Sequence, residues 1–311
     1  MLRHSPDIHG FQIPGLDRQV LISLFADDTA LYLNENTNYH SVQQILDRWC
    51  RASGAKFNIN KTEIIPIGTP AYRNRLTTQR TLNPTDALPL DPQIRISPDG
   101  HPIRYLGAWI GNDVDDAVPW EPILDKMRTK LTNWLPSRPT LMGKRLIVQM
   151  VVAGSTQFLT QVNGMPKHIE SAILTDIKHF LWPNRRSAAI SLDTLYLPVK
   201  DGGIGLLDLQ ACNEATDIIW LKSYLDLSPS RPAWAFIADI LINRLAPSSL
   251  HDIPRINAFL QNWSPVLQGP RTNAIPHTLL TMLKVAKKYN TNFAVLRLTD
   301  NLKRQIPAWC H

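Results

Sequence analysis

The hydrophobic and polar positions of the first third of the chain follow the short period of β-strands. Residues 20–34 hold two runs rich in Val, Ile, Leu, Phe and Tyr around a short polar segment, which is typical of a β-hairpin. Residues 56–67 and 104–110 predict further short strands. Residues 68–100 are rich in Thr, Pro, Asn and Asp and lack periodicity, so they predict a loop with at most one strand, at 94–96.

Helical spacing occurs once in this first part and then dominates the rest. Apolar residues recur at helical intervals over 42–50, with Ser41 as a candidate cap and Gly54 as the stop. After Pro119 an apolar stripe runs from Trp120 to Leu135. Further helices are predicted over 141–161, after Pro166, over 209–225 and in pieces beyond 228 that prolines interrupt.

These patterns predict an α+β protein with three parts. Residues 1–115 form a mixed segment of antiparallel strands and helix, residues 116–227 are helical, and residues 228–311 are helical without a recognisable chemical motif. The three cysteines are far apart, which argues against a zinc site or a disulfide framework and favours a reducing compartment. The uncharged stretch 146–166 contains too many polar groups for a membrane span, so it predicts a buried helix.

Composition adds a weak preference for polyanionic partners. The 311 residues are 44% hydrophobic, which is a globular composition, and they carry 33 Lys and Arg against 26 Asp and Glu, a net charge of +7. Residues 120–150 alone hold six cations and two acids, a net of +4. The N-terminus has no apolar core of a signal peptide, so we expect an intracellular protein, nuclear or cytoplasmic, that is neither secreted nor bound to a membrane.

The polar segment inside the predicted hairpin has unusual chemistry. It reads Phe25-Ala26-Asp27-Asp28-Thr29, and no cation lies between Arg18 and Arg48 to neutralise the two adjacent carboxylates. Hard oxygen ligands with this charge suit Mg²⁺ or Mn²⁺, and paired acids hold such ions in two-metal phosphoryl transfer. The residues by themselves leave a second interpretation open, an ordinary acidic turn.

The order of motifs along the chain resembles the reverse transcriptases of non-LTR (LINE-type) retrotransposons. Phe-Ala-Asp-Asp between two apolar strands is similar to their active-site hairpin, with Phe25 in place of the more familiar Tyr. Asn60-Lys61-Thr62-Glu63 resembles the strand that follows, and Arg104-Tyr105-Leu106-Gly107 resembles the hairpin that grips the primer terminus. Phe180-Leu181-Trp182 and Gly202-Gly203-Ile204-Gly205-Leu206 look like the region after the thumb of these enzymes.

This resemblance implies a partial palm over residues 1–115 and a thumb with its connection over 116–227. It implies RNA-templated DNA synthesis with Mg²⁺ or Mn²⁺, with an RNA template, a DNA primer or an RNA–DNA hybrid as partners. Asp27 and Asp28 would be metal ligands, and Lys61 would lie near the incoming triphosphate. Tyr105, Leu106 and Gly107 would place the primer end, and Lys126, Arg128 and Lys130 would contact phosphates.

The same resemblance implies that part of the family's active site is missing from this chain. The family uses a third carboxylate on an upstream apolar strand, whereas Asp7 and Asp17, the acids before the pair, lie outside such a strand. We therefore expect a chain truncated at the N-terminus, inside the palm, and also at the C-terminus. It would lack polymerase activity alone and have an exposed sheet edge that favours self-association. The alternatives are a non-catalytic RNA- or DNA-binding protein and a remnant of such an element.

Overall fold

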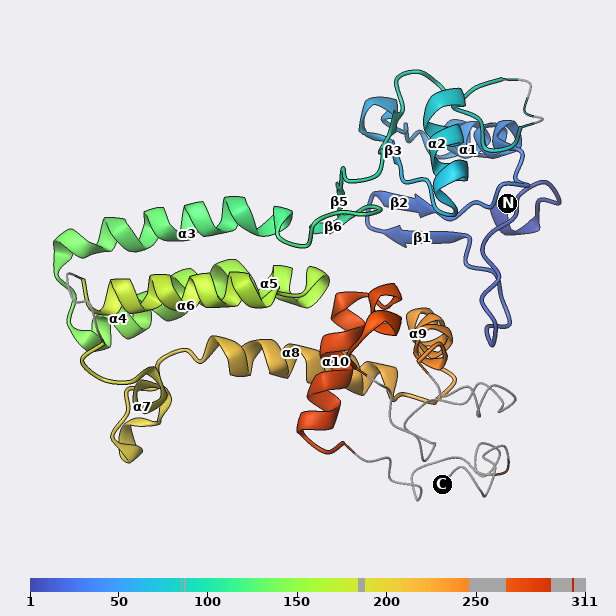
Figure 1. Cartoon of the computed structure of the whole chain (residues 1–311). Helices are drawn as coiled ribbons and strands as arrows, with labels where there is room; N and C mark the ends of the chain where they lie inside the picture. The colour runs from blue at the N-terminus through green and yellow to red at the C-terminus, as the bar shows by residue number, and fades with distance from the viewer. Residues whose placement is uncertain (85, 87, 184–187, 246–266, 292–303, 305–311) are drawn as a thin grey trace. The chain divides into compact units, whose positions relative to one another are not determined.

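The structure is a computed structural model that describes every residue except 85, 87, 184–187, 246–266, 292–303 and 305–311 (Figure 1). The chain divides into two compact units, residues 1–115 and 116–311, which are described here one at a time. The described residues form helices and small two-stranded sheets, which confirms an α+β protein.

Three two-stranded sheets form the β-structure of the first unit. The hairpin predicted within residues 20–34 is confirmed as β1 (Ile22–Phe25) paired antiparallel with β2 (Asp28–Leu31). A second antiparallel hairpin joins β5 (Ile103–Tyr105) to β6 (Ala108–Ile110). The third pair, β3 (Glu63–Ile64) with β4 (Arg95–Ile96), is parallel, so the expectation of antiparallel strands holds for two sheets of three.

The strand predicted over 56–67 is much shorter than expected. The 3₁₀ turn η2 (Ile59–Lys61) interrupts it, because Lys61 N–H and Thr62 N–H bond back to the carbonyls of Asn58 and Ile59. The Thr62 hydroxyl also donates to the Asn58 carbonyl, at 3.1 Å. Such local bonds compete with a sheet ladder, which leaves two residues for β3.

Helix α1 (Tyr39–Ser53) is capped three residues before the expected Ser41. The cap is Asn38, whose side chain accepts hydrogen bonds from the backbone N–H groups of His40 and Ser41, and the helix ends at Gly54 as predicted. Its inner face buries Val42 completely against Ile8 and Leu21. The Ser41 prediction was wrong because Asn38 already supplies the oxygen that the first turn needs.

Helix α2 (Pro70–Gln79) lies in the segment that the sequence predicts to be a loop. Leu76 is its single buried residue, so the helix has no apolar stripe that a periodicity argument could detect. The local signal was Thr69 followed by Pro70, since the Thr69 hydroxyl accepts from Tyr72 N–H and proline is favoured in a first helical turn.

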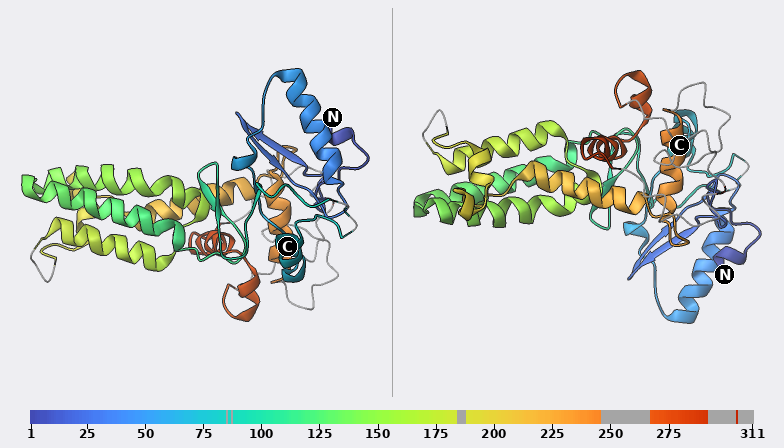
Figure 2. Two further views of the ribbon diagram at one scale, coloured as in Figure 1. Left: turned by 90° about the horizontal axis from the view of Figure 1, so that it is seen from above. Right: turned by 90° about the horizontal axis from the view of Figure 1, so that it is seen from below.

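The second unit is helical, and its first helices run side by side in Figures 1 and 2. They are α3 (Glu121–Trp134), α4 (Leu141–Val148), α5 (Gly154–Asn163) and α6 (Lys167–Leu181), which confirm the predicted helices. A π-helical turn, η5 (Gln149–Ala153), joins α4 to α5 in one continuous helix. The expectation that this helix is buried is half right, because one face is buried and the other is exposed.

A second core lies between α8 (Leu209–Tyr224), α9 (Ala233–Asn243) and α10 (His277–Lys288). Prolines mark helix starts here: Pro232 precedes α9 and Pro276 precedes α10. Other prolines of the predicted helical pieces (Pro247, Pro254 and Pro265) lie outside the described residues. The remaining short elements are α7 (Leu192–Tyr196) and the 3₁₀ turns η1 (Leu2–His4), η3 (Val118–Trp120), η4 (Leu135–Ser137), η6 (Val199–Asp201) and η9 (Pro270–Ala274). Within the described segments, no helix is both long and apolar enough to cross a membrane.

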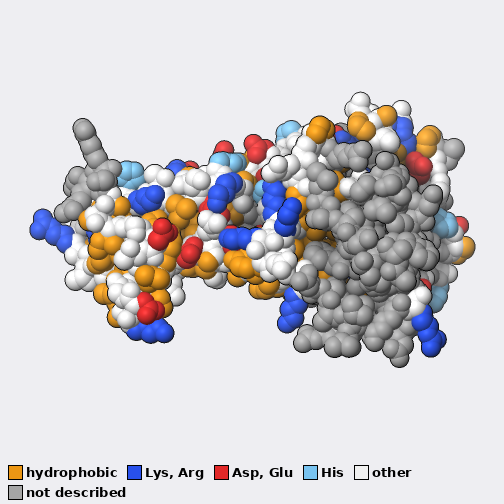
Figure 3. Space-filling model, turned by 60° about the horizontal axis from the view of Figure 1, so that its bottom comes forward, with side chains coloured by type: hydrophobic (Ala, Val, Ile, Leu, Met, Phe, Trp, Pro, Cys, Tyr) orange, Lys and Arg blue, Asp and Glu red, His pale blue; other side chains and the backbone are white. Residues whose placement is uncertain are grey.

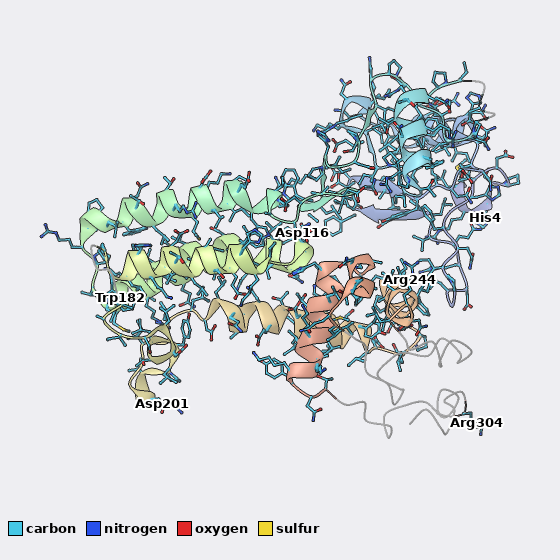
Figure 4. The ribbon with its side chains drawn as sticks, viewed as in Figure 1. His4, Asp116, Trp182, Asp201, Arg244 and Arg304 are labelled. Atoms are coloured by element: carbon cyan, nitrogen blue, oxygen red, sulfur yellow. The ribbon has the colours of Figure 1, made fainter. Side chains whose placement is uncertain are left out.

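The glycine-rich loop after α7 has a packing role. It follows Asp201, which is labelled in Figure 4 together with Trp182 at the end of α6. A Cβ at Gly203 would lie 2.0 Å from the Leu197 carbonyl oxygen, so the two backbone segments approach too closely for any side chain. The Gly205 carbonyl accepts a hydrogen bond from Arg145 Nε at 2.9 Å, which ties this loop to α4.

Polar groups join α8 to α10. Lys288 Nζ donates to both carboxylate oxygens of Glu214, at 2.6 and 2.7 Å, and the Tyr289 hydroxyl donates to Oε2 at 2.6 Å. Burial by itself would raise the pKa of Glu214, because it disfavours the charged carboxylate. The hydrogen bonds to the carboxylate outweigh the effect of burial and lower the pKa of Glu214 to about 2. One turn further along α8, burial raises the pKa of Asp217 to about 6, and the Thr281 hydroxyl donates a hydrogen bond to its Oδ1 at 3.2 Å.

Asp217→Asn is expected to raise the melting temperature of the protein at pH 8 and to leave it nearly unchanged at pH 3.5. The folded state favours the protonated carboxyl, so the stability linked to Asp217 is present below the unfolded pKa near 4 and is lost as the pH rises through about 6. Circular dichroism melts at the two pH values measure this. An equal or lower melting temperature for the variant at pH 8 would contradict it.

Candidate functional site

The acidic pair lies at the tip of the β1–β2 hairpin. Phe25 pairs with Asp28, so Ala26 and Asp27 form a two-residue turn and Asp28 is the first residue of β2. Ala26 has φ of +51°, a left-handed conformation that costs a residue with a Cβ about 1 kcal/mol. The hairpin therefore holds two consecutive carboxylates at a strained turn.

Both carboxylates are exposed, and so are the hydrophobic side chains beside them. Leu24 and Phe25 are 68% and 64% exposed, although most large apolar side chains in strands are buried. Among the described residues, no hydrogen bond or ion pair involves the carboxylate of Asp27 or Asp28. The tip thus combines uncompensated negative charge with an exposed apolar surface.

The donor set at the tip fits a magnesium or manganese ion. Mg²⁺ usually keeps several waters and binds through one or two carboxylates, and Asp27 and Asp28 supply two hard oxygen donors with no competing cation in the described contacts. Within the described residues, no third Asp, Glu, His or Cys joins them in a group that could hold a metal ion. Two carboxylates without further protein ligands suit a weakly held, hydrated ion.

Lys61 is exposed at the end of η2, immediately before the segment that leads into β3. No described hydrogen bond or ion pair joins it to Asp27 or Asp28, so the described contacts do not bring these residues together. The neighbouring Glu63 is held by Arg95 across the β3–β4 pair, at 2.9 Å. The role of Lys61 beside a triphosphate stays a prediction.

Tyr105, Leu106 and Gly107 form the tight end of the β5–β6 hairpin. Tyr105 pairs with Ala108, and the two turn residues both have positive φ, +48° at Leu106 and +86° at Gly107, the signs required by a type I′ turn. The Tyr105 hydroxyl is buried and has no hydrogen-bond partner among the residues that the structure describes. Tyr32 is the residue after β2. Burial is the main cause that raises the pKa of Tyr32, and the neighbouring Tyr105 raises it further, so the β5–β6 hairpin lies near the end of β2.

The predicted phosphate-binding side chains of α3 are exposed in the second unit. The helix buries Leu124, Met127 and Leu131, which leaves Lys126 and Lys130 on its exposed surface. Arg128 is exposed as well, but its Nε donates to Asp176 of α6 at 2.9 Å. Its charge is therefore partly compensated, which the sequence could not indicate because Asp176 lies 48 residues away.

Two further cations of this region are turned into the protein. Lys144 Nζ donates to the Leu181 carbonyl at 2.7 Å, and burial lowers the pKa of Lys144. Arg145 binds the Gly205 carbonyl. The net charge of +4 over residues 120–150 therefore overstates the charge available to a partner, and Figure 3 shows hydrophobic side chains interspersed with Lys and Arg on the helical part.

The comparisons with known proteins give one distant relationship. No family model matches the chain. It is 22% identical over 226 residues to the "Transposon TX1 uncharacterized 149 kDa protein" of Xenopus laevis, a match that covers 71% of this chain and 16% of that protein. The chain thus spans about one sixth of the length of the curated relative that it matches. The similarity supports the prediction that this chain is related to a transposon protein.

Proposed function

We propose that this chain is part of an RNA-directed DNA polymerase of a non-LTR retrotransposon, with residues 1–115 as part of its palm and residues 116–227 as its thumb and connection. The observation that carries the proposal is the pair of exposed, uncompensated carboxylates, Asp27 and Asp28, in the tight turn of an antiparallel hairpin. The similarity to a transposon protein supports the same origin.

In this proposal Asp27 and Asp28 hold one or two Mg²⁺ or Mn²⁺ ions. When bound, such an ion would supply positive charge that neutralises the charge developing on the transferred phosphoryl group. The exposed Phe25 ring lies beside the carboxylates and offers an apolar surface to a nucleotide. Lys61 contributes a positive charge toward the triphosphate, and the turn of Tyr105, Leu106 and Gly107 holds the primer end.

The proposal is tested by the effect of Mg²⁺ on binding of a recessed RNA–DNA primer–template with a matching deoxynucleotide. We expect Mg²⁺ to tighten binding by the wild-type chain about threefold or more at constant ionic strength, because an ion held by Asp27 and Asp28 would add positive charge that attracts the triphosphate. Asp27→Asn and Asp28→Asn should abolish the increment, whereas Asp17→Asn, an exposed acid of the same unit, should retain it. Fluorescence anisotropy measures the affinities.

An increment that is absent from the wild type, or unchanged in Asp27→Asn, would contradict the proposed metal site. Primer extension provides the second readout. We expect no extension by this chain alone, since two carboxylates hold the ions weakly. Clear extension that Asp27→Ala abolishes would show that the chain is active by itself.

A non-catalytic role in binding nucleic acid is the second candidate, and one observation favours it: no third acid or histidine joins the pair among the described residues. This candidate expects hybrid binding that weakens steeply with salt and is indifferent to both Mg²⁺ and Asp27→Asn. The anisotropy experiment therefore separates the two functions.

A further inference from the structure

The side chain of Arg73 on α2 joins three segments of the first unit. Its Nε donates to both carboxylate oxygens of Asp99, at 2.8 and 3.0 Å, and its Nη2 donates to Oδ2 of the same residue at 2.8 Å. Nη2 also donates to Asp113 at 2.8 Å, and Nη1 donates to the Gly68 carbonyl at 2.8 Å. The Arg73 side chain is only 14% exposed, so water screens these contacts less than those of a surface ion pair. We call Arg73, Asp99 and Asp113 the arginine clamp.

The two acids of the arginine clamp flank the β5–β6 hairpin. Asp99 lies before β5, and Asp113 lies after β6. Next to them, the Gly100 N–H donates to the Asn112 carbonyl at 2.8 Å and joins the two arms of the hairpin. The Asn112 side chain donates to the Pro66 carbonyl at 2.7 Å. One guanidinium thus binds both arms at the base of the hairpin and connects that base to α2.

The geometry of the arginine clamp requires arginine. The guanidinium is planar and presents several N–H groups in fixed directions, whereas a lysine supplies a single nitrogen. Two nitrogens of Arg73 bind Asp99, and hydrogen bonds of this bidentate kind are stronger than single, exposed ones. The side chain of Asp113 is 72% exposed and accepts from Nη2 alone among the described contacts, so we expect it to contribute less than Asp99.

The direction of the hairpin at its base decides where its turn lies. Strands β5 and β6 have three residues each, so the turn is about 10 Å from the base. A tilt of about 20° at the base would therefore move the turn by about 3 Å. Displacements of even ~1 Å matter where a group must be held in a reactive position.

We propose that Arg73 is a positioning residue for the primer end. Helix α2 lies between residues 60–63 and 104–107 and belongs to neither of these motifs, and it brings Arg73 to the hairpin base. The arginine clamp fixes the direction of the β5–β6 hairpin, so that the turn of Tyr105, Leu106 and Gly107 meets the primer end at a constant place. This use of the clamp rests on the proposed function.

Hydrogen exchange of the free protein, followed by mass spectrometry, tests the arginine clamp without nucleic acid. Arg73→Gln should speed exchange of the amides of residues 103–110 about tenfold, because the hairpin base opens more often. Asp113→Asn should speed it by about threefold or less, since it removes one exposed contact and asparagine tolerates the φ of +50° at this position. Arg95→Gln is the matched control, because it removes the ion pair with Glu63 in the same unit and should leave this exchange unchanged.

Fluorescence of 2-aminopurine at the 3′ end of the primer tests the positioning role. We expect the signal of a recessed RNA–DNA primer–template to change when the wild-type chain saturates it, because the hairpin turn contacts the terminal base. Arg73→Gln should reduce this change about twofold or more, while the dissociation constant stays within about twofold, since the lysines of α3 that contact phosphates are unaltered. Arg73→Lys should restore at most part of the signal, because one ammonium cannot replace the fork.

Unchanged hydrogen exchange in Arg73→Gln would overturn the arginine clamp. Faster exchange with a full primer-end signal would overturn the positioning role. The same conclusion would follow from a loss of signal matched by an equal loss of affinity in both Arg73→Gln and Asp113→Asn. A wild-type chain without any primer-end signal would contradict the proposed function and, with it, this use of the clamp, whereas hydrogen exchange would still decide whether the clamp holds the hairpin.

Discussion

Gly203→Ala is expected to lower the free energy of unfolding of the helical unit by about 2–3 kcal/mol, as an overpacked site does. Its new Cβ would lie 2.0 Å from the carbonyl oxygen of Leu197 and 2.7 Å from the Leu197 Cβ, and a backbone group cannot rotate away as a side chain can. The loop must therefore shift, and with it the Gly205 carbonyl that holds Arg145 on α4. Urea unfolding followed by circular dichroism at 222 nm measures the loss.

Gly154→Ala is the matched control for this substitution. Gly154 is at the start of α5 with open space around its Cβ position, so alanine adds helix propensity without a collision. It should stabilise the unit by about 0.5–1 kcal/mol. If both variants changed stability equally, the close approach at Gly203 would not be the cause of the loss.

Replacing Lys126 and Lys130 together by glutamine is expected to weaken binding of an RNA–DNA hybrid about 20-fold at 50 mM salt. Both side chains are exposed on α3, and neither forms a described ion pair. Each lysine that neutralises a phosphate releases about one counterion, so the double variant should also lower the slope of log affinity against log salt by about 1.8. Anisotropy titrations at several salt concentrations give both quantities.

Arg128 provides an internal comparison on the same helix. It already donates to Asp176, so Arg128→Gln should change hybrid affinity less than either lysine variant. Lys222→Gln, on the exposed surface of α8, should leave affinity unchanged if binding is localised to α3. Equal losses in the single variants Lys126→Gln, Lys130→Gln, Arg128→Gln and Lys222→Gln would indicate a diffuse effect of net charge instead of a surface on α3.

The local elements of this fold were largely predictable. The β1–β2 hairpin and the helices α3, α4, α5, α6 and α8 were predicted from apolar periodicity and helix-start signals, which act between near neighbours. Helix α2 and the cap at Asn38 were missed because their determinants are one buried leucine and one side-chain oxygen, which leave no periodic pattern. The tip position of Asp27 and Asp28 was predictable, and their metal-binding role remains a prediction.

By itself, the sequence determined the β1–β2 hairpin and most of the helices, and it placed two carboxylates together, because adjacent residues need no fold to bring them close. Tertiary structure alone decided which charges stay available. Lys144, Arg145 and Arg128 carry the same formal charge as Lys126, yet they bind groups 37, 60 and 48 residues away. It also decided that Met150 is exposed while Val151 is buried, since burial depends on which neighbouring helix covers a face.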